Sequence, residues 1–177
     1  MARPRLAAVA LAGGAMFCAA MWLLLAQPSR GEEAKPSEPV AVERRENIRV
    51  VYQIKDDDWL EGVGKGLAYL KKLVTAYRTM GVPAKEVHVS AVFHGNAGYW
   101  MLRDGLYEAH ARKPGGNPNQ ALIRELLDAG VSIELCAQTM REHSWKPEDV
   151  LPGVRIVVGA YPRVIDLELR GYAYIRF

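Results

Sequence analysis

The folded part of this sequence predicts an α/β fold in three layers, α/β/α, built on a mainly parallel five-stranded sheet. Apolar, β-rich segments alternate along the chain with segments of helical period, which is the order expected of βα units. The helical segments are long enough to serve as the crossover connections that parallel strands require. The segments around Val50, Val89 and Val157 are apolar almost throughout, as expected of strands that are covered on both faces.

The first half of the domain supplies two strands, each followed by a helical segment. Residues 48–54 are β-rich and end at an acidic turn. From Glu61 the apolar residues are spaced i, i+4, i+7 and i+11, which predicts a helix that Gly81 ends. The second strand is predicted at 87–93, and a short helical stretch follows around 99–106.

The third strand is introduced by the clearest helix start in the sequence. Asn117 is expected at the N-cap, Pro118 at the first helical position and Gln120 three residues after the cap. This helix should reach Ala129 before Gly130 stops it. The segment 130–136 then predicts a strand that ends at a cysteine, and the polar residues after that cysteine are expected to form a loop.

Two strands complete the predicted sheet. Residues 147–150 are expected to form at most one helical turn, and 154–158 a fourth strand. A helix that begins at Pro162 should run to Leu169, and residues 172–176 are expected to form a fifth strand.

The segments before residue 47 differ from the domain. Residues 6–25 form an apolar run preceded by two arginines, which predicts a signal peptide or N-terminal membrane anchor within residues 1–26. Either one would place the rest of the chain in the periplasm or on the extracytoplasmic face of the membrane, tethered by 6–25 if the segment is retained. Residues 27–46 carry prolines and many charges and are expected to be a disordered linker. The folded domain is therefore predicted at 47–177.

The charge balance of the domain disfavours a nucleic-acid partner. Residues 47–177 contain 17 Lys and Arg against 15 Asp and Glu, which gives a formal net charge of +2. No basic stripe interleaved with aromatic residues is present, although such a stripe is the usual footprint of nucleic-acid binding. No nucleic-acid partner is expected.

Cys136 and His94 are the candidate catalytic residues. Both follow predicted parallel strands, and the carboxyl ends of such strands share the edge of the sheet where ligands collect. A thiolate at Cys136 would be an effective nucleophile, with His94 as a base or ligand contact. The alternatives are a buried, inert Cys136 that packs as a small hydrophobe, and a His94 that only caps a turn.

No cofactor or metal is expected. The four histidines lack metal-ligand spacing, and no C-x-x-C motif is present. The segment 62–66 is glycine-rich and lies between a strand and a helix, where a phosphate-binding loop would belong. It matches neither G-x-G-x-x-G nor the P-loop, so nucleotide or flavin binding is a weak hypothesis.

Four stretches together resemble the DsrE/DsrF-like family of sulfur-handling proteins. They are Val50-Val51-Tyr52; Ala91-Val92-Phe93-His94-Gly95 with Arg103-Asp104-Gly105-Leu106; Ala129-Gly130-Val131-Ser132-Ile133-Glu134-Leu135-Cys136; and Gly171-Tyr172-Ala173-Tyr174-Ile175. The third stretch is the most specific, because it places Cys136 where the sulfur-carrying cysteine of the family lies. The resemblance implies an α/β/α domain that assembles into homo-oligomers, either trimers or hexamers.

The same resemblance implies that Cys136 accepts a sulfane sulfur as a persulfide and hands it to another protein. His94, Thr139 and Arg141 are expected as neighbours from the edge argument alone. Two departures concern the partners: relay members are cytoplasmic, and they carry an Arg-Arg-Gly pattern after the cysteine, where this chain has Ala137-Gln138-Thr139. The sequence thus predicts an extracytoplasmic sulfur carrier with unknown donor and acceptor. The alternative is a non-catalytic oligomeric module that binds a small ligand and has a structural Cys136.

Overall fold

The structure is a computed structural model that describes residues 38–177, and Val42–Phe177 form one compact unit. The predicted signal or anchor and the first part of the predicted linker lie outside the described residues. Residues 38–46 contain no helix or strand, and their side chains are exposed. Among the residues that are described, no helix has the length and apolar character needed to cross a membrane.

A five-stranded sheet forms the middle layer, and every neighbouring pair of its strands is parallel. The strand order is β6-β5-β4-β1-β7, so β4 and β1 are central, β6 and β7 are edges, and the chain crosses over between non-sequential neighbours. The strands are β1 (Ile48–Ile54), β4 (Val87–Phe93), β5 (Ser132–Cys136), β6 (Arg155–Val157) and β7 (Ala173–Arg176). The predicted fold class and strand number are confirmed.

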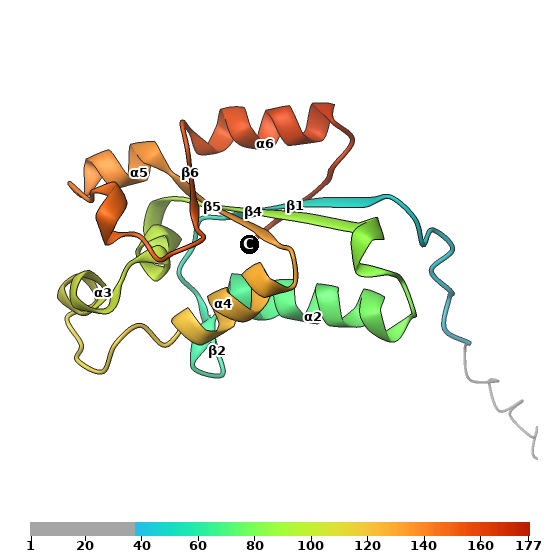
Figure 1. The fold of residues 1–177 in the computed structure, drawn as a ribbon, viewed down its shortest axis with the longest axis horizontal. Coiled ribbons are helices and arrows are strands. Elements are labelled where there is room, and N and C mark those ends of the chain that lie inside the picture. Colours follow the sequence, from blue (N-terminus) through green and yellow to red (C-terminus); the bar gives the residue numbers. More distant parts are fainter. Residues whose placement is uncertain (1–37) are drawn as a thin grey trace, which may run out of the picture. The chain divides into compact units, whose positions relative to one another are not determined.

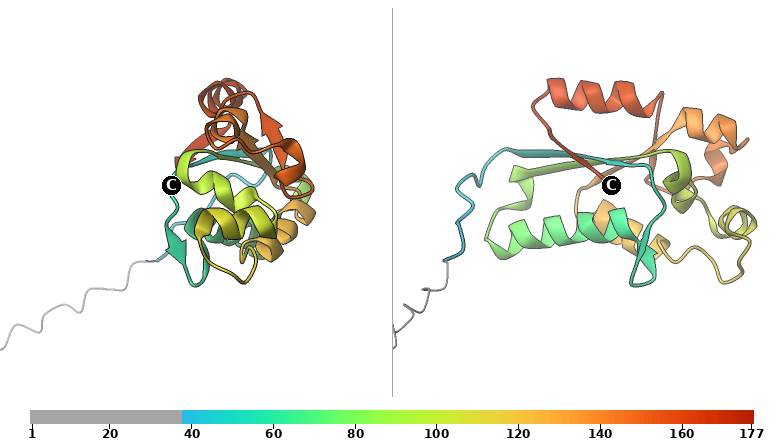
Figure 2. Two further views of the ribbon diagram at one scale, coloured as in Figure 1. Left: turned by 90° about the vertical axis from the view of Figure 1, so that its left-hand side faces the viewer. Right: turned by 180° about the vertical axis from the view of Figure 1, so that it is seen from behind.

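Helices cover both faces of the sheet, which gives the three layers (Figures 1 and 2). One face carries α2 (Lys65–Thr79) and α4 (Gln120–Asp128), and the other carries α6 (Ala160–Leu169) with the short α5 (Ala137–Glu142) near the end of β5. Helix α3 (Asp104–Ala111) and the 3-10 segments η1 (Ala84–Glu86), η2 (Gly95–Met101) and η3 (Pro147–Asp149) make the remaining connections.

Each face of the sheet has its own apolar core. The larger core lies between the sheet and α2 and α4, and its fully buried side chains include Phe93, Trp100 and Leu135. The smaller core lies beneath α6. It consists of six buried residues: Val51, Val92, Cys136, Ala160, Val164 and Leu167. Because successive side chains of a strand point to opposite faces, Leu135 and Cys136 enter different cores.

The helix predicted from Glu61 begins four residues later than expected. Residues 59–64 instead form an antiparallel hairpin, β2 (Trp59–Leu60) with β3 (Val63–Gly64). The two residues of its turn, Glu61 and Gly62, have φ values of 51° and 84°. A two-residue turn with φ positive at both positions is type I′, which matches the twist of paired strands and favours glycine. The helical spacing of Val63 with Leu67 concealed this turn.

Three further expectations need correction. The segment around 99–106 is two elements, because η2 ends at Met101 and α3 continues to Ala111. The predicted strand 154–158 shrinks to β6, which is an exposed edge strand and not a doubly covered one, because it pairs only with β5. The Asn117 carboxamide does accept the backbone N–H of Asn119 at 3.0 Å, as a capping residue would, but α4 itself starts at Gln120.

Candidate functional site

The carboxyl ends of β1, β4, β5 and β6 meet at one edge of the sheet, because all pairs are parallel. In β4 and β5, Val92 pairs with Glu134 and Phe93 with Leu135. One further step in this register places His94 beside Cys136. The two candidate residues, which are separated by 41 positions in the sequence, therefore occupy adjacent strand ends.

Cys136 is a free cysteine, and it is buried with 4% of its surface exposed. It is the last residue of β5, and it packs in the small core with Val92 of β4 and with Ala160 and Val164 of α6. The N-terminal part of α6 therefore covers the thiol. A reagent can reach the sulfur only if α6 or the residues before it move.

The residues after Cys136 form a helix, whereas the sequence predicted a loop. In α5 the polar side chains of Gln138, Arg141 and Glu142 are exposed, whereas Thr139 and Met140 are buried. The Thr139 hydroxyl accepts the backbone N–H of Gly95 at 3.0 Å. Thr139 therefore ties α5 to the segment that follows His94.

Gly98 allows η2 to approach α5 closely. A Cβ atom at Gly98 would lie 2.8 Å from Cγ2 of Thr139, which is too close for an ordinary contact. The hydrogen bond from Gly95 and the close contact at Gly98 join η2 to α5 side by side. Together they fix the backbone that follows His94 and Cys136.

His94 is buried, and its ring nitrogen Nε2 lies 2.8 Å from Nε2 of Gln53. The Tyr174 hydroxyl donates to Oε1 of the same carboxamide, which orients the Gln53 amide with its N–H toward His94. An amide N–H only donates, so Nε2 of His94 accepts and the imidazole proton lies on Nδ1. With the Gln53 amide in this orientation, His94 is a neutral imidazole that carries its proton on Nδ1.

The surroundings of His94 also favour its neutral form. Burial lowers the pKa of His94 below the usual 6.5, and the positive charges of Lys55 and Arg176 lower it further, against an opposing effect of Asp56. The ring of Tyr161 meets the His94 ring edge-on, with 5.4 Å between the centroids. His94 is therefore a neutral donor in a partly apolar site at neutral pH.

A buried ion pair fastens α6 above this site. The Glu134 side chain is fully buried on β5, and both of its oxygens accept from the guanidinium of Arg163, at 2.7 and 2.8 Å. Ser132 donates a further hydrogen bond to Glu134 at 2.9 Å. This pair holds α6 over the strand that ends at Cys136. Sequence analysis missed it, because Glu134 and Arg163 are 29 positions apart and neither stands out by spacing.

The other residues considered in the sequence lie in separate surroundings. Arg141 is exposed, and Nη2 donates to the Gln138 side chain at 2.6 Å. The His143 ring stacks on Trp145 with 4.5 Å between centroids, and His110 meets both rings edge-on. Within residues 38–177, no group of three or more His, Cys, Asp or Glu side chains is arranged to hold a metal ion.

The glycines of the segment 62–66 are accounted for by the turn and by packing. Gly62 occupies the hairpin turn with positive φ. A Cβ at Gly64 would lie 2.5 to 2.7 Å from the Trp100 ring, and one at Gly66 would lie 2.8 Å from Ile54. These glycines let the hairpin and the start of α2 approach the sheet, so the segment has structural reasons for its composition.

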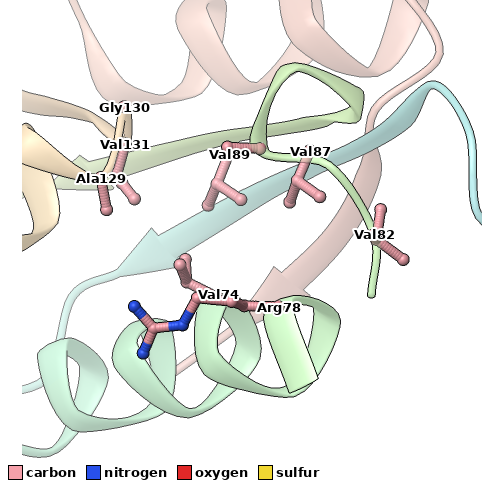
Figure 3. A pocket seen from close by; sticks show the side chains of 9 residues that line it. Val74, Arg78, Val82, Val87, Val89, Ala129, Gly130 and Val131 are labelled. Carbon is pink, nitrogen blue, oxygen red and sulfur yellow. The ribbon is translucent and has the colours of Figure 1, made fainter. Parts of the chain in front are cut away.

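A cavity of about 170 Å³ lies at the opposite edge of the sheet, between the end of α2 and the start of β4 (Figure 3). Val74 and Arg78 of α2 face Val87 and Val89 of β4 across it, and Val131 closes one end. Apart from Arg78, its walls are apolar or small residues. The amino end of β4 lies here, so this cavity is remote from the strand ends that carry His94 and Cys136.

The fold and this edge define a class of protein: a three-layer α/β/α domain with a free cysteine at the carboxyl end of an inner parallel strand, β5. The chain belongs to the DsrE/DsrF-like family, whose family model matches residues 70–177. This confirms the resemblance found in the sequence. No curated protein is similar enough in sequence to count as a match.

Two solved structures share the fold. One is a protein of unknown function, MTH1491 from Methanobacterium thermoautotrophicum, at 22% identity and a TM-score of 0.53, covering 73% of this chain and 99% of that one. The other is the ychN protein from E. coli, at 15% identity and a TM-score of 0.51, covering 73% of this chain and all of that one. At these identities the likeness establishes the fold alone.

Proposed function

We propose that this protein is a sulfur carrier that holds sulfane sulfur as a persulfide on Cys136. The observation that carries the proposal is the placement of Cys136 and His94 at adjacent strand ends of a DsrE/DsrF-like domain. The cysteine is free, and no second cysteine lies in residues 38–177 to form a disulfide with it. A single thiol suits a carrier better than a dithiol oxidoreductase.

The loading step is a sulfur transfer between two sulfur atoms. The Cys136 thiolate attacks the terminal sulfur of a donor that contains a sulfur–sulfur bond. A new bond forms between Sγ and that sulfur, the donor bond breaks, and the leaving group departs with the electron pair. Cys136 is then a persulfide anion, and attack by an acceptor thiolate on its outer sulfur unloads it.

His94 would act on the persulfide as a hydrogen-bond donor. Its Nε2 is engaged by Gln53, which leaves Nδ1–H to donate. A neutral N–H donor stabilises an anionic sulfur without forming a permanent ion pair. We therefore assign His94 to stabilisation of the persulfide, whereas the sequence also allowed the role of base.

The remaining parts of the proposal concern the setting of the protein. The apolar run at 6–25 supports export or a membrane tether, and hence an extracytoplasmic sulfur relay or sulfur oxidation. Family resemblance supports a homo-oligomer.

The test uses the full chain with Cys18→Ser, so that Cys136 is the only thiol. After incubation with polysulfide, the intact mass should rise by one sulfur atom and return after reduction. The matched control, Cys18→Ser with Cys136→Ser, should show no change. Absence of the gain, with a thiol that resists alkylation until the protein unfolds, would contradict the carrier.

A small-ligand-binding module is the second candidate, and two observations favour it. Cys136 is 4% exposed and packs in an apolar core, which suits a structural residue. An open cavity of about 500 Å³ also lies near the carboxyl ends, and its walls include Trp59, Tyr99 and Tyr107. If Cys136 is unreactive and a ligand binds in the cavity lined by Trp59, Tyr99 and Tyr107, ligand binding is the function of the protein.

A further inference from the structure

A second cavity at the carboxyl edge is lined by Gln53 and Tyr161, two residues whose side chains contact His94. It is open, with a volume of about 510 Å³, and its walls include Gln53, Lys55, Tyr161, Val164, Tyr174 and Arg176. In β1 and β7, Gln53 pairs with Arg176. Lys55 follows Gln53 by two positions, so strand alternation brings both cations toward the face that α6 covers.

We propose that this cavity binds a small inorganic dianion that carries a terminal sulfane sulfur, and that Lys55 and Arg176 hold its charge. The proposal rests on the proposed function, because it identifies the chemical class of the donor for Cys136. It makes that donor a free anion small enough to enter the cavity, and not the surface of another protein.

The two cations are available for a ligand. Among residues 38–177, neither Lys55 nor Arg176 forms an ion pair with a carboxylate. Both act on His94, whose pKa they lower. Glu168 also lines the cavity, but it is not among the charges that act on His94, whereas Asp56 is. Lys55 and Arg176 thus line the cavity and also lie close enough to His94 to act on its pKa, with Asp56 opposing them.

One residue, Val164, is shared by the cavity wall and the small core that contains the thiol. Tyr161 lines the cavity as well, and its ring contacts His94. Tyr161 is 62% exposed, so little packing opposes its displacement. A shift of Tyr161 and Val164 would open a path from the bound anion to Sγ.

The chemistry balances for the two simplest dianions of this class. With thiosulfate, the Cys136 thiolate bonds to the sulfane sulfur and sulfite leaves with the electron pair of the broken bond. With tetrasulfide, the terminal sulfur is transferred and trisulfide leaves. In both cases the reactants and the products carry the same total charge, three negative charges. The Cys136 sulfur is oxidised and the leaving group is reduced, so no further reactant is needed.

Binding is tested apart from transfer, in the full chain with Cys18→Ser and Cys136→Ser. Thiosulfate and tetrasulfide are titrated separately by calorimetry. We expect binding of at least one, weakened about tenfold or more by Lys55→Gln with Arg176→Gln, because charge-assisted hydrogen bonds are lost. Lys85→Gln, an exposed lysine outside the cavity, should leave binding unchanged. No binding of either anion, or binding that the double substitution leaves unchanged, would overturn the proposal.

A second measurement uses the unmodified cavity, so it does not depend on the folding of a variant. Sulfate is a dianion without a sulfane sulfur, and it should slow the loading of Cys136 by competition in the Cys18→Ser chain. If sulfate does not slow the loading of Cys136 at any concentration, the proposed anion binding in the cavity is wrong, whereas the proposed sulfur carrier is unaffected. If anions bind at Lys55 and Arg176 but Cys136 gains no sulfur, the proposed sulfur carrier is wrong, whereas the proposed anion binding in the cavity is unaffected.

Discussion

His94 couples the candidate site to the pH dependence of stability. Its folded-state pKa lies below the ordinary 6.5, chiefly because the ring is buried. As the pH falls below about 6.5, the unfolded chain takes up a proton that the folded chain does not. The free energy of unfolding must therefore decrease as the pH falls through this range.

We expect His94→Gln to reduce this loss of stability between pH 7 and pH 5, as measured by urea unfolding at a series of pH values. Part of the dependence should remain, since burial and His143 lower the pKa of His110 as well. Thr79→Gln, at an exposed position without a titratable group, is the control and should leave the slope unchanged. A slope that is equal in His94→Gln and in the unsubstituted protein would contradict the pKa assignment.

Glu134 and Arg163 are the residues whose separate removal should be most costly. Arg163→Met leaves the fully buried Glu134 carboxylate without its bidentate partner, which should lower the free energy of unfolding by about 3 kcal/mol. Glu134→Met with Arg163→Met should recover most of that loss, because both charges are gone. Denaturant unfolding measures each variant.

The neighbouring surface pair supplies the control for this prediction. Arg170 and Asp166 lie 3.5 Å apart with more than half of each side chain exposed. Arg170→Met should therefore cost less than about 0.5 kcal/mol. If Glu134→Met with Arg163→Met proved no more stable than Arg163→Met alone, the loss in the single variant would not come from an unpaired, buried Glu134 carboxylate.

At the level of elements, the β2–β3 hairpin depends on the absence of one side chain. Gly64→Ala would place a Cβ within 2.7 Å of the Trp100 ring, which cannot yield because Trp100 is fully buried. We expect a loss of about 2 kcal/mol in denaturant unfolding, as for other overpacked cores. Gly105→Ala is the matched change: its Cβ meets nothing within 4 Å in α3, so stability should stay constant or rise slightly.

The contact between η2 and α5 should depend on a single hydroxyl. Thr139→Val keeps the shape of the side chain but removes the acceptor of the Gly95 N–H, at a cost of about 1–3 kcal/mol. Hydrogen exchange at Gly95 should quicken in Thr139→Val and stay slow in Thr139→Ser, which retains the hydroxyl. Equal protection in both variants would show that Gly95 is protected by other contacts.

For the whole molecule, the sequence predicted the layers and the strand ends because both arise from short-range patterns. The apolar strands and their alternation with helices predicted a parallel sheet. The parallel sheet in turn predicted that His94 and Cys136 lie at the same edge. Contacts between distant positions have no such pattern. Gln53 is 121 residues from Tyr174, and only the fold reveals that both belong to one chain of hydrogen bonds with His94.

The edges of the sheet were equally hidden. Residues 154–158 read as a doubly covered strand, yet Ile156 and Val158 are 42% and 87% exposed on the edge strand β6 and just after it. An apolar segment cannot indicate from its own sequence whether a neighbouring strand covers it. Exposed apolar side chains of this kind are consistent with a surface that a second molecule covers.

Helix α6 also carries exposed apolar side chains. Ile165 and Leu169 are spaced four residues apart, so they lie along one side of α6, and their exposed fractions are 55% and 85%. We propose that this stripe contacts a second copy of the chain, in line with the homo-oligomer that the family resemblance implies. Its apolar character suits a permanent interface better than a transient one.

Two charged substitutions test the stripe without affecting either core. Ile165→Glu with Leu169→Glu should dissociate the oligomer, because two carboxylates cannot be buried in an apolar interface without partners. Light scattering coupled to gel filtration should then report the monomer mass, whereas Lys71→Glu with Lys85→Glu, at exposed positions away from α6, should keep the oligomer. If the unsubstituted chain is itself a monomer, or if the charged variant stays assembled, the contact between copies does not involve this side of α6.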